Sequence, residues 1–284
     1  MSDSHFDGEV IPDPKDIARS VDERFEPRIV MTVPDKRNPK LHRVMELVNA
    51  DDDLYGLWLA ANVNAVERLG MTDHGPVHVK IVMNMAVRML RLLVEAGVET
   101  GVVRNYEMSN KDAEVVVALA ALLHDVGMSI HRQDHEAFSL FIARDKLKEI
   151  LPEIYDKRHE SLIRSEILHA IISHRSGGKP LTLEAGVVRI ADALDMAKGR
   201  SRIPFAAGSL SIHSVSAAAV DSVSIDPGEE KPIRITVELS NSAGLFQLDQ
   251  LLRDKLNGSG LEPYLEIQAT VGEEERRLLT DFRL

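Results

Sequence analysis

Six side chains that can bind a divalent metal ion are spread along the middle of the sequence. They are His78, His124, Asp125, His135, His174 and Asp192. Neutral imidazoles and ionised carboxylates are good ligands for such ions. Each lies at or near the end of an apolar stretch with helical spacing, and helices that pack antiparallel bring such ends together. Taken singly, each histidine is typical of a surface or satisfied core residue, but their joint placement predicts a metal site.

The stretch 115–129, VVVALAALLHDVGMS, is the centre of this pattern. Its apolar run predicts a buried helix that ends in His124 and Asp125. Burial of an imidazole and a carboxylate is unfavourable unless something pairs with them, and one cation can pair with both. The alternative is a histidine at the favourable end of the helix dipole, followed by an aspartate that starts the next turn. The other ligand candidates favour the cation.

Two of the histidines have neighbours that could take their place. His131 lies four residues before His135 but falls in a predicted loop, so His135, at the start of a predicted helix, is preferred. His169 and His174 are five residues apart, which turns them roughly 140° from one another on a helix. Both cannot easily face one pocket. His174 is preferred because two glycines follow it and open space for a substrate, whereas His169 is expected in the core.

Helical periodicity predicts the elements that position these side chains. Helices are expected in two segments within 41–69 and then over 72–97, 115–125, 134–151, 159–173 and 182–198. Asp73 and Pro76 together make a good helix start, with a capping side chain and a proline in the first turn. A polar loop is expected between 97 and 115. This part of the chain is therefore predicted to be an almost strand-free helical bundle.

The pattern changes near Pro204. Residues 233–239 and 265–271 alternate between apolar and polar, which predicts strands, and 209–225 and 276–284 are also strand-like. A stripe of leucines predicts a helix over 243–256. The fold class is therefore predicted to be mostly α, with a small α+β module at the end. The expected parts are an N-terminal arm over 1–40, a helical domain over 41–205 and the module over 206–284.

Composition limits the classes of function. The chain has 284 residues, 44% of them hydrophobic and 28% charged, which is typical of a soluble globular protein. Its net charge of −11 gives no general attraction to extended nucleic acid or to anionic membranes, so a site that handles phosphate needs a local cationic centre. The absence of cysteine excludes thiolate catalysis, disulfides and cysteine-ligated zinc. Without a signal-peptide pattern or an apolar run of about 18 residues, a cytoplasmic location is expected.

Charged side chains flank two of the predicted ligands. The candidates for substrate binding are Arg175, Lys179, Asp195, Lys198, Arg200 and Arg202. Two of the cations follow His174 and three follow the helix of Asp192, where they could hold phosphate oxygens. An ordinary solvated charge run would look the same. Asp195 shares nearly one helical face with Asp192, where it either orients a ligand or a water, or forms a salt bridge along the helix to Lys198.

The sequence motifs around these ligands resemble those of the HD superfamily of metal-dependent phosphohydrolases. Members carry a His, a His-Asp pair and a distant Asp on separate helices. Here DHGPVHVKIV holds His78, LLHDVG holds His124 and Asp125, and RIADALD holds Asp192. The resemblance covers roughly residues 70–202. The words HDVGMSIHR, LTLEAGVVRIADALDMAKGRSRIPF and SNSAGLF are similar to those of a prokaryotic group of HD proteins with an appended C-terminal module.

The resemblance implies an all-helical catalytic domain and one or two divalent ions (Mn, Fe, Mg, Co, Ni or Zn). It also implies that a metal-activated water hydrolyses a phosphate ester or anhydride in a small phosphorylated metabolite or nucleotide, with His124 and Asp125 at the catalytic centre. Dinuclear members add two histidines from the intervening helices, which here implies His135 and His174, with Asp125 bridging ions about 3.5–4 Å apart. With a single ion, those two histidines would instead donate to phosphate. Met128 stands where cyclic-dinucleotide phosphodiesterases carry a lysine, and their GYP motif is missing, which argues against that substrate.

Two other functions are left open by the sequence. The same six ligands could hold two irons, as in inositol oxygenase and its phosphonate-cleaving relatives, and would then support oxygen chemistry. The pocket could also sense a nucleotide and signal through the C-terminal module, although intact ligands argue against a pure sensor. Ser240–Ser242 is expected to cap the following helix rather than to bind an anion. Homo-oligomerisation through the sheet edge or helix of the module is left undecided.

Overall fold

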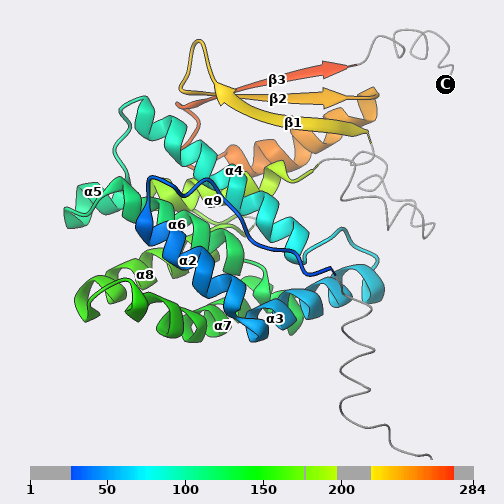
Figure 1. Cartoon of the computed structure of the whole chain (residues 1–284). Helices are drawn as coiled ribbons and strands as arrows, with labels where there is room; N and C mark the ends of the chain where they lie inside the picture. Colours follow the sequence, from blue (N-terminus) through cyan, green and yellow to red (C-terminus); the bar gives the residue numbers. More distant parts are fainter. Residues whose placement is uncertain (1–26, 176, 197–218, 272–284) are drawn as a thin grey trace, which may run out of the picture. The chain divides into compact units, whose positions relative to one another are not determined.

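The structure is a computed structural model that describes residues 27–175, 177–196 and 219–271. The chain divides into two units, Met1–Val30 and Met31–Leu284, and all the described helices and strands belong to the second. They form a mostly helical architecture with a small three-stranded sheet in the C-terminal part (Figure 1). The predicted fold class is therefore confirmed, while the domain boundaries near residues 40 and 205 stay predictions.

Eight α-helices precede the sheet among the described residues. They are α2 (Pro39–Ala50), α3 (Asp52–Asn62), α4 (Pro76–Glu95), α5 (Gly101–Tyr106), α6 (Asn110–Leu123), α7 (His135–Ile150), α8 (Lys157–Ser173) and α9 (Leu183–Leu194). Three short turns of helix extend them: η1 (Val63–Arg68), η2 (Val126–Ser129) and η3 (Leu151–Glu153). Every helix that periodicity predicts before residue 196 occurs, with ends that differ by a few residues.

Helix α5 occupies the segment predicted as a polar loop. Its first N–H groups, at Gly101 and Val102, each donate to the carboxylate of Glu184 on α9 at 3.0 Å. A short helix is marginal by itself, because nucleation is unfavourable and its first N–H groups lack partners within the helix. A side chain more than 80 residues later in the chain supplies those partners, so local sequence could not reveal this helix.

The sheet has the strand order β1 (Val220–Pro227), β2 (Ile233–Leu239) and β3 (Leu265–Val271). Strands β1 and β2 pair antiparallel with Val223 opposite Val237, and β2 and β3 pair parallel with Ile235 opposite Ile267. The two strands predicted over 233–239 and 265–271 are thus present. Strand β1 covers the end of the strand-like stretch 209–225, while 209–218 and 276–284 lie outside the described residues.

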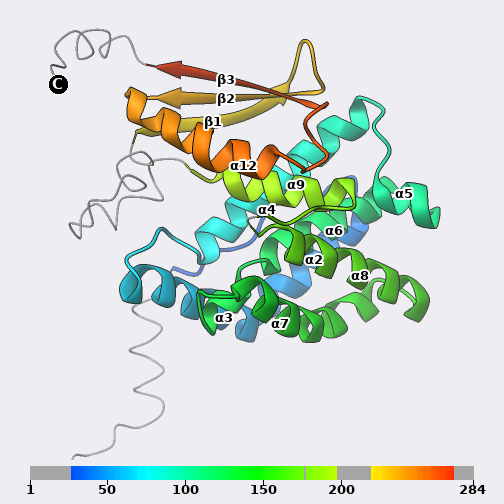
Figure 2. The ribbon, with the colours of Figure 1, turned by 180° about the vertical axis from the view of Figure 1, so that it is seen from behind.

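The crossover from β2 to β3 carries η4 (Ser242–Gly244), η5 (Gln247–Leu252) and α12 (Arg253–Leu256). Figure 2 shows this helical segment along one face of the sheet, next to α9, and η5 and α12 both contact α9. Helix α4 contacts β1 and β2, and Arg88 on α4 donates to the carbonyl of Ile225 at 2.8 Å. The crossover helix therefore lies directly against the helix that carries Asp192.

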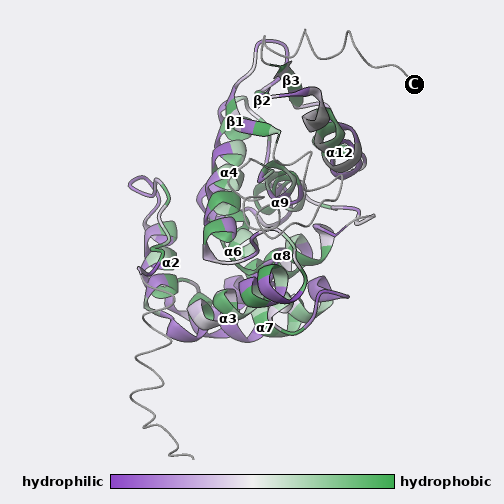
Figure 3. Ribbon diagram, turned by 90° about the vertical axis from the view of Figure 1, so that its right-hand side faces the viewer, coloured by the Kyte–Doolittle hydropathy of each residue, from purple (hydrophilic) through white to green (hydrophobic). Residues whose placement is uncertain are grey.

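Helix α6 is the core helix. All residues from Val115 to Leu123 are fully buried, as expected of a helix that is apolar on every side. It begins five residues earlier than predicted because the carboxylate of Asp112 accepts from the N–H and hydroxyl of Ser109, a capping-box arrangement. Surrounding helices such as α2 and α7 alternate between hydrophobic and hydrophilic stretches (Figure 3). Within the described ranges, no helix is long and apolar enough to cross a bilayer.

Candidate metal centre

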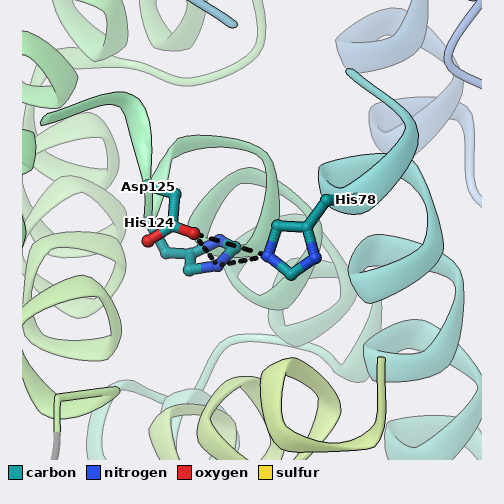
Figure 4. A group of neighbouring side chains, drawn as sticks. All are labelled: His78, His124 and Asp125. Atoms are coloured by element: carbon teal, nitrogen blue, oxygen red, sulfur yellow. Dashed lines mark hydrogen bonds and ion pairs between the residues drawn. The ribbon is translucent and has the colours of Figure 1, made fainter. Parts of the chain in front are cut away.

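The six predicted ligands come together, although they belong to separate helices. His78 lies on α4, His124 and Asp125 follow α6, His135 opens α7, His174 follows α8 and Asp192 lies on α9. Three overlapping groups of three have ligand atoms within 4.8 Å of one another. Figure 4 shows one of them, with His78 and the His124–Asp125 pair turned toward each other.

Asp125 stands between two pairs of imidazoles. Its Oδ2 lies 3.4 Å from Nε2 of His78 and 3.3 Å from Nε2 of His124. Its Oδ1 lies 3.2 Å from Nε2 of His135 and 3.6 Å from Nε2 of His174. Each carboxylate oxygen thus faces one pair of ring nitrogens, which is the arrangement of a carboxylate that can bridge two cations.

Asp192 lies closest to the first pair. Its Oδ1 lies 3.6 Å from Nε2 of both His78 and His124, whereas its Oδ2 lies 3.2 Å from Nζ of Lys255. The first half of the cluster therefore offers two imidazoles and two carboxylate oxygens. The second half offers two imidazoles and an oxygen of Asp125, and Asp192 also has a ligand atom within 4.8 Å of one on His174.

The outer ring nitrogen of every imidazole has an oxygen acceptor beside it. The Nδ1–O pairs are His78 with Asp195 Oδ2 (2.6 Å), His124 with Ala121 O (2.8 Å), His135 with Arg132 O (3.0 Å) and His174 with Ile171 O (2.6 Å). Carbonyl and ionised carboxylate oxygens only accept, so Nδ1 carries the hydrogen in the neutral rings of His78, His124 and His174. Their Nε2 lone pairs then face inward, which is the tautomer that binds a metal through Nε2. Nδ1 of His135 also lies 3.0 Å from the Nη1 donor of Arg132, so its contacts do not select one tautomer.

Gly127 allows the His-Asp turn to lie against the start of α7. A Cβ at this position would be 2.1 Å from the carbonyl oxygen of His135 and 2.5 Å from the backbone nitrogen of Ser139, so only glycine fits. The N–H of Gly127 donates to Oγ of Ser139 at 2.9 Å, and that hydroxyl donates to the carbonyl of His124 at 2.6 Å. The sequence HDVG thereby packs the turn that carries His124 and Asp125 closely against the helix that begins with His135.

Burial and mutual charge shift the pKa values in the cluster. Burial opposes a positive charge on His124, but the carboxylates of Asp125 and Asp192 outweigh it and raise its pKa to about 10. Burial, with the charges of His124 and Lys255, lowers the pKa of His174 to about 3. Burial also opposes charge on Asp125 and Asp192, yet the cations around them hold both pKa values well below the usual range. The two carboxylates thus favour a positive charge between them, which a divalent ion would provide.

A small polar cavity of about 260 Å³ opens on the second half of the cluster. Four of the predicted ligands line it: Asp125, His135, His174 and Asp192. The other lining residues are His74, Arg132, Glu136, Arg189, Asp254 and Lys255. Every one of these side chains is ionisable, so the cavity suits a small charged group rather than an apolar one.

The predicted substrate-binding residues are distributed differently. Arg175 and Lys179 are exposed and do not line this cavity. Asp195 lies behind His78, bonded to its ring, and so stands in the ligand-orienting position. Lys198, Arg200 and Arg202 lie outside the described residues. Their roles in substrate binding stay predictions.

The two rejected histidines lie away from the centre. His131 is exposed, and its Nδ1 accepts from the N–H of Gln133 at 3.0 Å. His169 accepts from the N–H of Leu181 at 3.0 Å through Nε2. His135 and His174, in contrast, both face Asp125.

Three cationic residues near the centre escaped the sequence prediction. Arg189 is a single cation within the apolar stretch of α9. A charged residue in an apolar helix is a signal of a buried polar contact, and that signal was present in the sequence. Arg132 falls in a loop and Lys255 in the C-terminal crossover, so neither carries a local signal that links it to the ligands.

Comparison with known proteins gives the family. The family model of the HD domain matches residues 82–197 of this chain. An uncharacterised protein of Methanocaldococcus jannaschii is 45% identical over 215 residues, which cover 76% of this chain and 83% of that protein. Ribonuclease Y of Thermoanaerobacter pseudethanolicus is 28% identical over 168 residues, which cover 56% of this chain but only 30% of that enzyme. Together with the His and Asp cluster, these matches show that the chain belongs to the HD superfamily of metal-dependent phosphohydrolases.

Proposed function

We propose that this protein hydrolyses a phosphate ester or anhydride bond in a small phosphorylated metabolite or nucleotide, and that two divalent ions assist the reaction. The observation that carries the proposal is the position of Asp125, whose two oxygens each face a pair of imidazole Nε2 atoms. We assign His78, His124 and Asp192 to the first ion and His135 and His174 to the second, with Asp125 shared.

Bound ions would supply Lewis acidity and hydroxide at neutral pH, the usual chemistry of paired-metal hydrolysis. Four imidazoles and two carboxylates favour manganese, iron, cobalt, nickel or zinc over magnesium, which prefers oxygen ligands and water. The acceptors at Nδ1 keep His78, His124 and His174 in one tautomer and orientation, so these ligands need little reorganisation on binding.

The cavity supports a phosphoryl group as the part of the substrate that enters. Arg132 and Lys255 both line it and can neutralise phosphate oxygens that the metal ions do not contact. Its volume of about 260 Å³ is below the usual range for drug-sized ligands, about 300–1,000 Å³. The remainder of a larger substrate would therefore lie outside it.

The net charge of the protein favours a small substrate over an extended one. Ribonuclease Y is by its name an enzyme of RNA, so phosphodiester cleavage occurs among the relatives of this chain. A net charge of −11 opposes binding of an extended polyanion, because phosphate contacts by Lys and Arg dominate such binding. A small phosphate compound fits this protein better.

The test is a panel of phosphomonoesters, diphosphates, nucleotides and diesters, each assayed with manganese, cobalt, nickel, iron, zinc and magnesium. We expect phosphate release or diester cleavage with at least one metal, and loss of that activity in His135→Ala. Inactivity of the wild-type protein with every metal would contradict the proposal. Oxygen consumption by the iron-loaded protein would then favour the di-iron oxygenase, for which the same donor set is suitable.

A further inference from the structure

A cation from the C-terminal module reaches the metal centre. Lys255, on α12, donates from Nζ to Oδ2 of Asp192 at 3.2 Å and to the carbonyl oxygen of His174. Its side chain is 20% exposed, and it lines the polar cavity with the ligands of the second pair. Asp192 precedes it by 63 residues, so the module and the helical domain share one site.

Arg189 holds this lysine in place. Its side chain is almost fully buried, at 1% exposure. It donates to the carbonyls of Lys255 at 2.7 Å and Asp254 at 3.1 Å, and also to that of Ser173 at 3.2 Å and that of Arg175 at 2.5 Å. One planar guanidinium with five N–H donors thus ties α12 to the end of α8 beside His174. The position of Lys255 is therefore fixed by a buried contact rather than by a flexible surface pair.

The contacts of Lys255 leave it a donor for a ligand. An ammonium group has three N–H donors, and within the part of the chain that the structure describes Nζ has two acceptors, Asp192 and the carbonyl of His174. Asp192 turns its other oxygen toward the imidazoles of His78 and His124. The third donor of Lys255 is then available at the wall of the cavity, where Arg132 supplies another cation.

We propose that Lys255 binds a phosphate oxygen of the substrate, so that the C-terminal module completes the substrate site of the helical domain. The inference rests on the proposed phosphohydrolase function for its ligand, although phosphate binding can be measured without turnover. A charge-assisted hydrogen bond from a fixed ammonium to a phosphate is among the stronger polar contacts. The competing explanation is an ion pair that only orients Asp192.

Binding of inorganic phosphate to the manganese-loaded full-length protein, measured by titration calorimetry, separates the two. We expect Lys255→Met to raise the Kd for phosphate by about tenfold or more, with the manganese content unchanged. Lys255→Arg should recover part of the affinity. The matched control is Arg253→Met, which removes the same charge from the same helix at a side chain that is 68% exposed and paired with Asp249. It should leave the Kd at the wild-type value.

Each contrary result has a definite meaning. Unchanged phosphate affinity in Lys255→Met, or no phosphate binding by the wild-type protein, overturns the inference. Loss of manganese from Lys255→Met also overturns it, because Lys255 would then act through Asp192. A wild-type protein that binds phosphate through Lys255 but hydrolyses no substrate would contradict the proposed function and leave this inference standing. Circular dichroism and thermal unfolding of each variant establish that it is folded.

Discussion

Helix α6 has a cluster of buried ionisable side chains at each end, and the two clusters are built in opposite ways. At the N-terminal end, Asp112 accepts from Nζ of Lys40 at 2.6 Å, from the hydroxyl of Tyr155 at 2.8 Å and from Ser109. Every contact joins a donor to an acceptor. The polar groups of this cluster therefore satisfy one another, and their hydrogen bonds stabilise the fold.

At the C-terminal end, acceptors face acceptors. Nε2 of His78 and Nε2 of His124 are 3.2 Å apart, and both point toward the oxygens of Asp125 and Asp192. When both imidazoles are neutral and carry their hydrogens on Nδ1, these groups have no hydrogen to share. Only a metal ion, or a proton on His124 as its raised pKa of about 10 indicates, can relieve the arrangement. One helix thus joins a cluster that stabilises the fold to a cluster that is incomplete without a cation.

The largest effect is expected from a substitution that disrupts the C-terminal cluster. Asp125→Asn keeps the size of the side chain but removes the charge that faces all four imidazoles. We expect bound metal, measured by plasma emission spectrometry, to fall to background and the hydrolysis rate to fall about a hundred- to a thousandfold, as for loss of an electrostatic group in a buried site. Full metal occupancy in this variant would show that the cluster is not the metal site.

The next largest effect is expected from a substitution that disrupts the N-terminal cluster. Asp112→Ala leaves the buried hydroxyl of Tyr155 without its acceptor and should lower the free energy of unfolding by about 1–3 kcal/mol, the usual cost of an unsatisfied buried polar group. The pair with Lys40 adds little, because the lysine side chain is 38% exposed. Urea unfolding measures this change. Metal content and activity per folded molecule should stay at the wild-type level. A loss of metal in Asp112→Ala would show that the two ends of α6 are not independent.

Metal removal distinguishes the clusters in a single protein. An ion that binds only the folded state adds about 2.7 kcal/mol when its free concentration is a hundred times its Kd. We therefore expect the melting temperature of the wild-type protein to fall on addition of a chelator, and that of Asp112→Ala to fall by a similar amount from its lower starting value. Asp125→Asn should not respond. A chelator-induced fall in Asp125→Asn would place the stabilising ion elsewhere.

The same contrast explains what the sequence could predict. Helix α6, the ligand types and the two strands 233–239 and 265–271 follow from short-range patterns, namely apolar period, caps and alternation. The ligands are recognisable because imidazole and carboxylate beside apolar runs are unusual. Helix α5 and Lys255 depend on partners 60 or more residues away in the chain. No local pattern encodes such contacts.

The position of Asp195 could not be predicted from the local sequence, because the helix ends one residue before it. The sequence predicts a helix to residue 198, in which Asp195 could pair with Lys198. Helix α9 instead ends at Leu194, and Asp195 is its C-cap with φ −76° and ψ 64°. That non-helical backbone turns the carboxylate toward His78. The contact with His78 therefore depends on where the helix ends, which is the least predictable part of an element, while Lys198 lies outside the described residues.

The smallest effect is predicted for substitutions of Asp195, and it tests whether this residue supports the metal site or the fold. Asp195→Asn can still place an amide oxygen beside Nδ1 of His78, but it lacks the charge that makes the imidazole a better ligand. Changes in such supporting partners weaken metal binding by about 10- to 100-fold. We expect about tenfold weaker manganese binding in Asp195→Asn and about a hundredfold in Asp195→Ala, measured by titration of the metal-free protein. Equal affinity in all three proteins would mean that the contact at Nδ1 serves the fold, as the contacts of Asp112 do, and not the metal.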